Sequence, residues 1–348
     1  MMPVFNLIAS PDTYYPCRED MLRDQQFREY WLDHFIQHFD LTARLSADVY
    51  GPSAAPRAQA CHAELAAQME KLRREPALYG ELNLQVLGVI RQNCLKHHDI
   101  ADPYAIIKAR ENQRCVPMFS QVIEEVDALT SPGAQLDRLI CGVFAGNIFD
   151  LGASATAHAF ADAGPAFFQV RDGIGRPWLI DQSAAFSTDY FARPPRKACM
   201  FVDNAGSDVV LGMLPLARWL AIRGTKIVLL ANEEPALNDI TAAELTELLG
   251  ELQTQDRQLA ELTRSGQICA VSSGGATPLI DLRQVSAACN AACVDADFLL
   301  LEGMGRGLES NFETAFTVPC VKLCMIKEPI VAQRMGGKVF DVVFRYEP

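Results

Sequence analysis

The chain has 348 residues, of which 49% are hydrophobic and 21% are charged, and its formal net charge at pH 7 is −12. The length allows about two domains, and the apolar content supplies a sizeable core, which excludes wholesale disorder. The acidic balance disfavours binding to the phosphate backbone of nucleic acids, because such binding depends on an excess of Lys and Arg.

The N-terminal sequence MMPVFNLIASPDTYY has no basic segment followed by an apolar one, so it does not predict a signal peptide. The eleven cysteines include no C-x-x-C pair, which favours reduced, buried thiols in a cytoplasmic protein. The stretch from Leu139 to Ala161 is largely uncharged, but Asp150 interrupts it, and a charge at mid-span is costly in a membrane. We therefore interpret it as buried structure of a soluble protein. The Met-Met start favours a complete chain.

Residues 1–135 are predicted to form a helical N-terminal region. Between Met21 and Phe39, aromatic residues recur at spacings of three and four, which is typical of a helix. Good helix formers predict further helices over 58–74, 82–95 and 104–128. His34 and His38 have the i, i+4 spacing of metal ligands on a helix. No third ligand is evident near them, so the sequence favours a surface or half-buried pair.

Residues 136–348 show short apolar runs that alternate with helical patterns. A helix is expected from Ser207, with Pro215 as a kink or a late start, and another from Thr241, which forms a capping box with Glu244. A third is expected over 282–292. Strands are expected over 198–202, 226–231, 268–272, 298–302, 321–326 and 338–344. This alternation predicts an α/β domain with a mostly parallel, doubly wound sheet.

Polar residues follow five of the predicted strands. In a doubly wound fold the loops after parallel strands meet at one edge of the sheet, where ligands bind. We therefore expect five segments to converge on one crevice. These segments are Asp203-Asn204, the loop 232–239, Ser272-Ser273-Gly274-Gly275, Gly303 to Arg306, and Lys327.

The residue types in this crevice indicate a chemistry. Asp203, Asn204 and Asp239 offer three oxygen ligands, which suit a hard divalent cation. Arg306 and Lys327 suit a phosphate, and the glycines of SSGGA and GMGRG allow backbone N–H groups to approach an anion closely. Together they predict metal-assisted chemistry on a phosphate ester.

Each of these elements also has an ordinary structural explanation. Asp203-Asn204 can be a turn with a helix cap, Asp239 can be a cap, and the SSGG loop can be a flexible turn. Arg306 and Lys327 can be solvated charges. The convergence favours a site, because capping does not require five such loops. The sequence has no P-loop and no G-x-S-x-G elbow, so those mechanisms are not expected.

Three segments, FVDNAGSDVVLG to PALNDIT, EGMGRGLESNF and VKLCMIKEPIVAQRMGGKVFDVVFRYEP, resemble the metal-dependent damage-control phosphatases. The likeness spans about residues 75–348 and is closest to the subfamily found as the C-terminal domain of an inactive animal pantothenate kinase and as stand-alone plant proteins. It implies a three-layer α/β/α domain preceded by helices. It also implies hydrolysis of a small phosphorylated metabolite with Mg²⁺, Mn²⁺, Co²⁺ or Ni²⁺. The implied substrate is 4′-phosphopantetheine or its oxidised or damaged forms, in coenzyme A metabolism.

The resemblance also assigns residues. Asp203, Asn204 and Asp239 match the metal positions, and Asn147 and Asp150 in AGNIFDLGA match a motif that lines the site. Asp150 would orient the attacking water or protonate the leaving alkoxide.

The remaining candidates concern the phosphate. Arg306 and Lys327 would hold phosphate oxygens and offset charge in the transition state. Asp203 is counted among the catalytic residues as well as the metal ligands. The residues expected to position the phosphate or the substrate tail are Asn147, Ser272, Ser273, Gly274 and Gly303.

Some positions depart from the subfamily pattern and keep alternatives open. Glu233 and Glu234 replace a small residue after the second-loop Asn, and Glu328 replaces an Asn after Lys327, so added negative charge could alter substrate preference. The kinase half is absent, and we do not expect phosphorylation of pantothenate. The alternatives are a broad sugar-phosphate phosphatase, a carboxyl methyltransferase, and a non-catalytic metal- or metabolite-binding regulator. A homo-oligomer stays open, and no membrane partner is expected.

Overall fold

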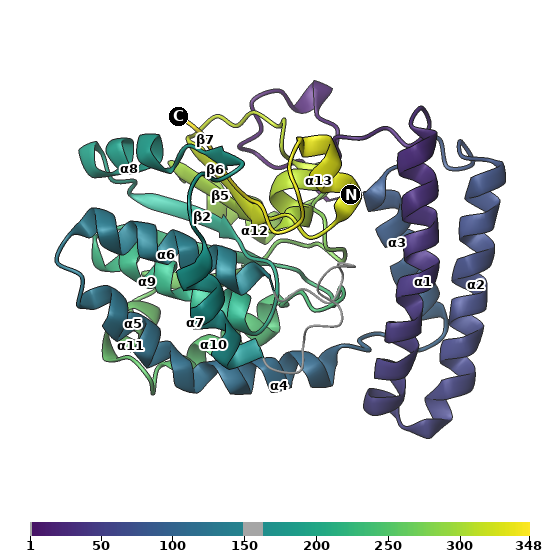
Figure 1. The fold of residues 1–348 in the computed structure, drawn as a ribbon, viewed down its shortest axis with the longest axis horizontal. Helices are drawn as coiled ribbons and strands as arrows, with labels where there is room; N and C mark the ends of the chain where they lie inside the picture. Colours follow the sequence, from purple (N-terminus) through teal and green to yellow (C-terminus); the bar gives the residue numbers. More distant parts are fainter. Residues whose placement is uncertain (1, 149–162) are drawn as a thin grey trace.

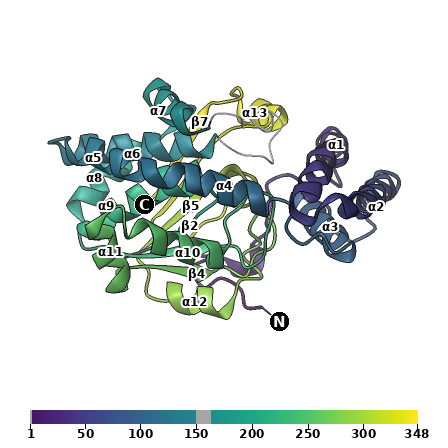
Figure 2. The same ribbon diagram turned by 90° about the horizontal axis from the view of Figure 1, so that it is seen from below.

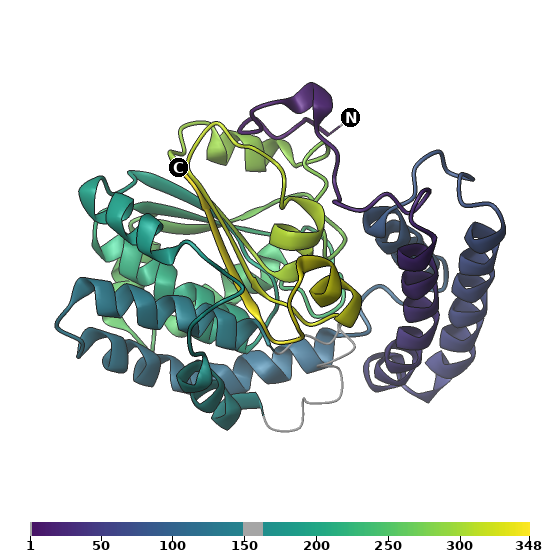
Figure 3. The ribbon, with the colours of Figure 1, turned by 45° about the horizontal axis from the view of Figure 1, so that its top comes forward.

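The computed structural model describes residues 2–148 and 163–348. A bundle of three helices lies to one side of an α/β body in Figure 1, and the rotated view of Figure 3 agrees. The bundle contains α1 (Gln25–Tyr50), α2 (Ala55–Arg74) and α3 (Leu84–His97). All three confirm the predicted helices, although α1 runs eleven residues beyond Phe39.

The start and the packing of α1 follow from its sequence. Asp24 caps the helix, since its side chain accepts a hydrogen bond from Phe27 N at 2.9 Å. The aromatic face then buries Trp31 and Phe39 against Leu65 of α2 and its neighbours. The same apolar cluster includes residues from the C-terminal segment of the chain, so it joins the bundle to the body.

The prediction of a single helix over 104–128 is wrong. This segment forms two helices, α4 (Ala105–Cys115) and α5 (Phe119–Asp127), separated by a 3₁₀ turn over Val116–Met118. Pro117 lies in that turn, where its missing N–H and its ring oppose a continuous α-helix. Because α5 contacts α6 (Pro132–Asn147) of the body, the boundary near residue 135 stays a prediction.

The body is built on one seven-stranded sheet, with the order β1-β7-β6-β5-β2-β3-β4. Neighbouring strands are parallel except for β6 and β7, which pair antiparallel. The mostly parallel sheet confirms the predicted fold class. Its strands are β1 (Ile180–Asp181), β2 (Lys197–Phe201), β3 (Lys226–Ala231), β4 (Ile268–Ser272), β5 (Phe298–Glu302), β6 (Cys320–Met325) and β7 (Val342–Glu347).

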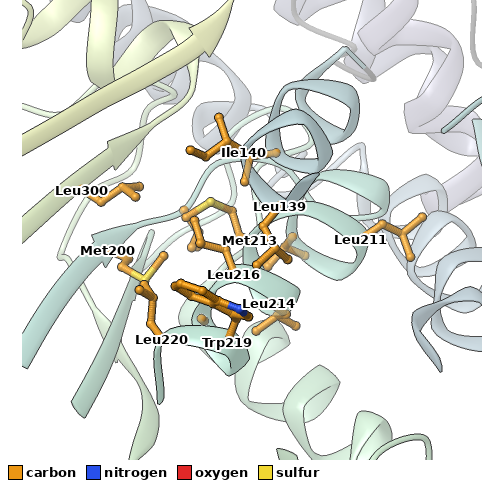
Figure 4. Packing of buried hydrophobic residues seen from close by; sticks show 14 of the residues in the cluster. Leu139, Ile140, Met200, Leu211, Met213, Leu214, Leu216, Trp219, Leu220 and Leu300 are labelled. Carbon is orange, nitrogen blue, oxygen red and sulfur yellow. The ribbon is translucent and has the colours of Figure 1, made fainter. Parts of the chain in front are cut away.

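Helices cover both faces of this sheet, and Figure 2 shows α6 and α12 on opposite sides of the strands. Met200 of β2 faces α6 and α9, and Figure 4 shows it near Trp219 and Leu220. Phe201, the next residue, belongs to the core on the α12 face. The body helices not yet given are α7 (Ala163–Gly173), α8 (Ser183–Ala192), α9 (Leu214–Ile222), α10 (Ala242–Leu252), α11 (Arg257–Arg264), α12 (Ala287–Cys293) and α13 (Pro329–Met335).

Two predicted helices differ in their starting points. The segment after Ser207 first forms a π-helical turn, η5 (Asp208–Met213), and α9 then begins with Pro215 in its first turn, which confirms a late start. The helix expected over 282–292 begins only at Ala287, with Ser286 as its cap. By contrast, the capping box of Thr241 and Glu244 opens α10 as predicted.

All eleven cysteines are free thiols, and ten of them are buried, as the prediction of buried thiols requires. Within residues 2–148 and 163–348, no helix combines the length and the apolar character needed to span a bilayer.

Candidate active site

Four of the five polar segments predicted after the strands meet at the carboxyl ends of parallel strands. Asp203 and Asn204 follow β2, and Asp239 lies in the loop between β3 and α10. The backbones of Asn204 and Asp239 form an isolated antiparallel bridge, which holds these two loops side by side. Arg306 lies in the π-helical turn after β5, η6 (Met304–Ser310), and Lys327 follows β6. All five side chains are buried.

Asn147, the last residue of α6, lies at the centre of this cluster. Its Nδ2 is 2.7 Å from Glu302 Oε1, 3.0 Å from Asp208 Oδ2 and 3.3 Å from Asp203 Oδ2. Lys327 Nζ donates to the backbone oxygen of Asn147 at 2.7 Å and to its Oδ1 at 3.2 Å. A carboxamide presents donors and an acceptor in one plane, so Asn147 can position the carboxylates and the ammonium group of Lys327 at the same time.

Sequence reasoning missed two acids of this cluster, Asp208 and Glu302. Glu302 Oε2 accepts from the backbone N of Asp203 at 2.8 Å, and Asp208 Oδ2 accepts from Asn204 N and Nδ2 at 3.1 and 3.0 Å. Both had a signal in the sequence. Glu302 ends the apolar run FLLLE, and Asp208 closes the DNAGSD motif. A charge at the end of a buried strand requires a partner, which is an argument for a site.

The electrostatics of these two acids reflect crowding away from water. Burial raises the pKa of Glu302 well above its usual value, and the nearby Asp208 carboxylate adds to this effect. Burial also raises the pKa of Asp208, although the charge of Lys327 and the bonds from Asn147 oppose the shift. A bound cation would relieve this repulsion.

The oxygen donors present here fit a hard divalent cation. Carboxylate oxygens of Asp203, Asp208 and Glu302 lie within 4.8 Å of one another, and all three residues are buried. Asp208 Oδ1 is buried and has no hydrogen-bond partner among the described residues. Ligand sets made only of oxygen favour Mg²⁺-like and Mn²⁺-like ions. Asp203 belongs both to this group and to the set predicted from the sequence.

The guanidinium of Arg306 lies between two of the predicted metal ligands. Its Nη1 donates to Asp203 Oδ1, and its Nη2 donates to Asp239 Oδ2 at 2.7 Å. Asp239 Oδ2 also accepts from Asn232 Nδ2 at 3.0 Å. Arg306 therefore offsets the charge of the acids in this arrangement, and its role toward a phosphate stays a prediction.

Gly303 allows its own backbone to approach Asp203 closely. Its φ is +98°, and a Cβ built on it would lie 2.3 Å from Asp203 Oδ2. Any larger residue would displace this carboxylate. The structure therefore brings Gly303 to the acids, as predicted. The group that it approaches is the Asp203 carboxylate, so its role toward a phosphate stays a prediction.

The loop after β4 lies apart from the acids. Ser272 Oγ donates to Glu233, and Ser273 Oγ accepts from Gly275 N at 3.3 Å. Ser273 and Gly274 line a separate cavity. The structure thus does not place Ser272, Ser273 or Gly274 against Asp203. The predicted catalytic Asp150 lies outside the described residues.

A cavity that is open to solvent lies over Asp203, Asn204 and Asp239, between the helical bundle and the loops at the strand ends. One wall comes from α1 and α3, and the other includes Asp203, Asn204 and Asp239. Glu328 also lines it, fully buried, and accepts a hydrogen bond from the Tyr30 hydroxyl. Glu234, another acid that departs from the subfamily pattern, forms an ion pair with Lys96 and does not line this cavity.

His34 and His38 are half-buried, as predicted, but they face the candidate site and line its cavity. Their rings stack with centroids 5.6 Å apart, and the Tyr30 ring stacks on His34 at 6.3 Å. Helical spacing does not indicate this placement, because it does not determine which element a helix face meets.

Comparisons with known proteins agree on one protein family. The model of the damage-control phosphatase ARMT1-like domain matches residues 36–343. The chain is 36% identical to damage-control phosphatase At2g17340 of Arabidopsis thaliana, over 91% of this chain and 87% of that protein. It is 38% identical to pantothenate kinase 2 of Arabidopsis thaliana, over 100% of this chain and 42% of the relative.

Two further matches extend this comparison. The mouse 4′-phosphopantetheine phosphatase is 27% identical over 99% of this chain and 49% of the relative. The chain thus spans less than half of the length of the kinase-named plant relative and of the mouse relative. A DUF89 family protein from Pyrococcus horikoshii has the same fold, with a TM-score of 0.66, 16% identity, and coverage of 91% of this chain and 98% of that chain.

Proposed function

The chain belongs to the ARMT1-like damage-control phosphatase family, and from this premise we propose that it hydrolyses the phosphomonoester of 4′-phosphopantetheine, or of its oxidised or damaged forms. The observation that carries the proposal is the buried cluster of carboxylates at the strand ends, of which Asp203 lines a cavity beneath the helical bundle. The name of the mouse relative supports the substrate class.

The metal ligands in this proposal are Asp203, Asn204 and Asp239. Asp208 and Glu302 either complete the coordination or hold those ligands in place. A bound divalent cation would polarise the phosphate ester and lower the pKa of a bound water. Mg²⁺, Mn²⁺, Co²⁺ and Ni²⁺ are the candidates.

The chain's own residues would place the reacting groups. Asn147 and Lys327 fix the orientation of the carboxylates through their mutual hydrogen bonds. The planar fork of Arg306 matches two phosphate oxygens, and it exchanges its carboxylate partners for them when substrate binds. Asp150 orients the attacking water or protonates the leaving alkoxide. The P–O bond of the ester breaks, the water oxygen bonds to phosphorus, and the alcohol leaves with a proton.

The setting of the reaction is also part of the proposal. Ten buried, reduced thiols are in keeping with a cytoplasmic enzyme. Its partner is a small phosphorylated metabolite.

The test of this proposal compares kcat/KM for 4′-phosphopantetheine with kcat/KM for fructose 1-phosphate, each with added Mg²⁺, Mn²⁺, Co²⁺ or Ni²⁺. We expect at least a tenfold preference for 4′-phosphopantetheine. A preference for the sugar phosphate would support a broad sugar-phosphate phosphatase and overturn the assigned substrate. Tight binding of phosphate ester without turnover would support a regulator and overturn the activity.

A further inference from the structure

The wall of the cavity opposite the acids comes from the helical bundle. Trp31, His34 and Phe35 of α1 and Gln92 of α3 contribute to it. Leu84 and Leu279 belong to the same lining, which adds apolar surface to the aromatic side chains of this wall. The bundle therefore presents to the acids a wall that suits the carbon skeleton of a substrate.

Two residues of this wall each carry a buried polar atom that lacks a partner in the described part of the chain. Trp31 is 6% exposed and its Nε1 has no acceptor, and Gln92 is 7% exposed and its Oε1 has no donor, among the described residues. The orientation of the Gln92 amide follows from its Nε2, which donates to the backbone oxygen of Pro235. Leaving a buried polar group without a partner costs free energy, because the group has lost its bonds to water. Because Trp31 and Gln92 both line the cavity, a ligand bound there can supply these missing partners.

The two unpaired atoms are one donor and one acceptor. An amide offers the complementary acceptor and donor, and an arm of amides joined by short alkyl units also matches the apolar side chains in the same lining. A compact sugar would stay near the acids and leave the apolar wall in water. The guanidinium of Arg91, also in the lining, is already bonded to Thr42 and Tyr104, so the wall does not call for a second anion.

We propose that Trp31 and Gln92 form a subsite that binds the amide-bearing arm of the substrate, remote from its phosphate. This inference rests on the proposed function and names the residues that would determine its specificity. Trp31 Nε1 donates to an amide oxygen of the arm, and Gln92 Oε1 accepts from an amide N–H.

The experiment measures binding of pantetheine, the arm without its phosphate, by calorimetry. Trp31→Phe removes the indole N–H and keeps an aromatic ring. The matched control is Trp178→Phe, because Trp178 is also 6% exposed and its Nε1 is also unpaired in the described part of the chain, but it does not line this cavity. Loss of one neutral hydrogen bond predicts that Kd for pantetheine rises about fivefold in Trp31→Phe and does not change in Trp178→Phe.

A second variant and a second readout complete the test. Gln92→Leu should also weaken pantetheine binding, and Trp31→Phe should raise KM for 4′-phosphopantetheine without changing kcat/KM for phenyl phosphate, which has no arm. Equal pantetheine binding by wild type and Trp31→Phe, or equal losses on both esters, would overturn the subsite. Arm binding that Trp31→Phe weakens, in a protein that releases no phosphate from 4′-phosphopantetheine, would refute the proposed function and leave the subsite standing.

Discussion

Gly303 offers a sharp test of the site, because one methyl group there acts directly on Asp203. A Cβ at this position would lie 2.3 Å from Asp203 Oδ2, whereas real Cβ contacts are essentially never shorter than 3.0 Å. The backbone cannot easily yield, since Gly303 N donates to Leu323 O at 3.0 Å and Gly303 O accepts from Gly307 N at 2.9 Å. The carboxylate must therefore move by about 0.7 Å or more.

This displacement predicts a loss of activity that backbone strain does not explain. A misplacement of about 1 Å costs on the order of a hundredfold in rate, which corresponds to about 2.7 kcal/mol in the activation free energy. We expect Gly303→Ala to lower kcat/KM by about that factor. Its positive φ adds about 1–3 kcal/mol of destabilisation, because an L side chain is disfavoured there.

Gly224→Ala is the matched control. Gly224 has a φ of +100° against +98° at Gly303, and a Cβ on Gly224 would meet nothing within 4 Å. Both variants should lose similar stability in urea unfolding, and Gly303→Ala alone should lose phosphate release and cation affinity. Equal kcat/KM for the two folded variants would refute the view that Gly303 serves Asp203.

Four further predictions follow from other parts of the chain. Asp203→Ala and Asp239→Ala should each abolish phosphate release while circular dichroism shows an intact fold, and full activity in either variant would contradict the metal assignment. Chelation should lower Tm, and a cation added at a hundred times its Kd should restore about 2.7 kcal/mol of unfolding free energy. Glu64, His97 and His98 form a separate group of possible ligands, so Glu64→Ala should leave the metal dependence of catalysis unchanged. Thr241→Ala should cost about 1 kcal/mol of unfolding free energy, because it removes the N-cap of α10. Thr246→Ala, in the exposed middle of the same helix, should cost less. The reverse order in urea unfolding would count against the capping box. In native protein a thiol reagent should react first at Cys269, because this thiol is partly exposed whereas Cys94 and Cys141 are buried. Mass spectrometry that finds either of these two modified first would contradict the buried packing.

The sequence predicted the body of the fold well for a physical reason. Buried parallel strands are short apolar runs, so 226–231, 268–272 and 298–302 were predicted with the bounds that β3, β4 and β5 have. The start of α10 was equally clear, because a capping box is a local pattern. The break at Pro117 was missed because the flanking residues are good helix formers on both sides.

The site was harder to predict, because it depends on contacts between distant elements. Asp208 belongs to the site because η5 packs closely on α6, where a Cβ on Gly146 would lie 2.7 Å from Ser207 O. The DNAGSD motif makes Asp208 a candidate, but this local pattern does not indicate that η5 packs so closely on α6. In the same way, the spacing of His34 and His38 identifies a helix face, and only the packing of the bundle against the strand-end loops brings that face to Asp203.

Phosphate release from 4′-phosphopantetheine tests the central claim most directly. The protein is first treated with a chelator and then assayed without added metal and with Mg²⁺, Mn²⁺, Co²⁺ or Ni²⁺ in turn, beside Asp203→Ala. The account predicts release that requires a divalent cation and disappears in the variant. Release that persists after chelation, or that Asp203→Ala retains, would contradict it, as would a folded protein that releases no phosphate with any of the four cations.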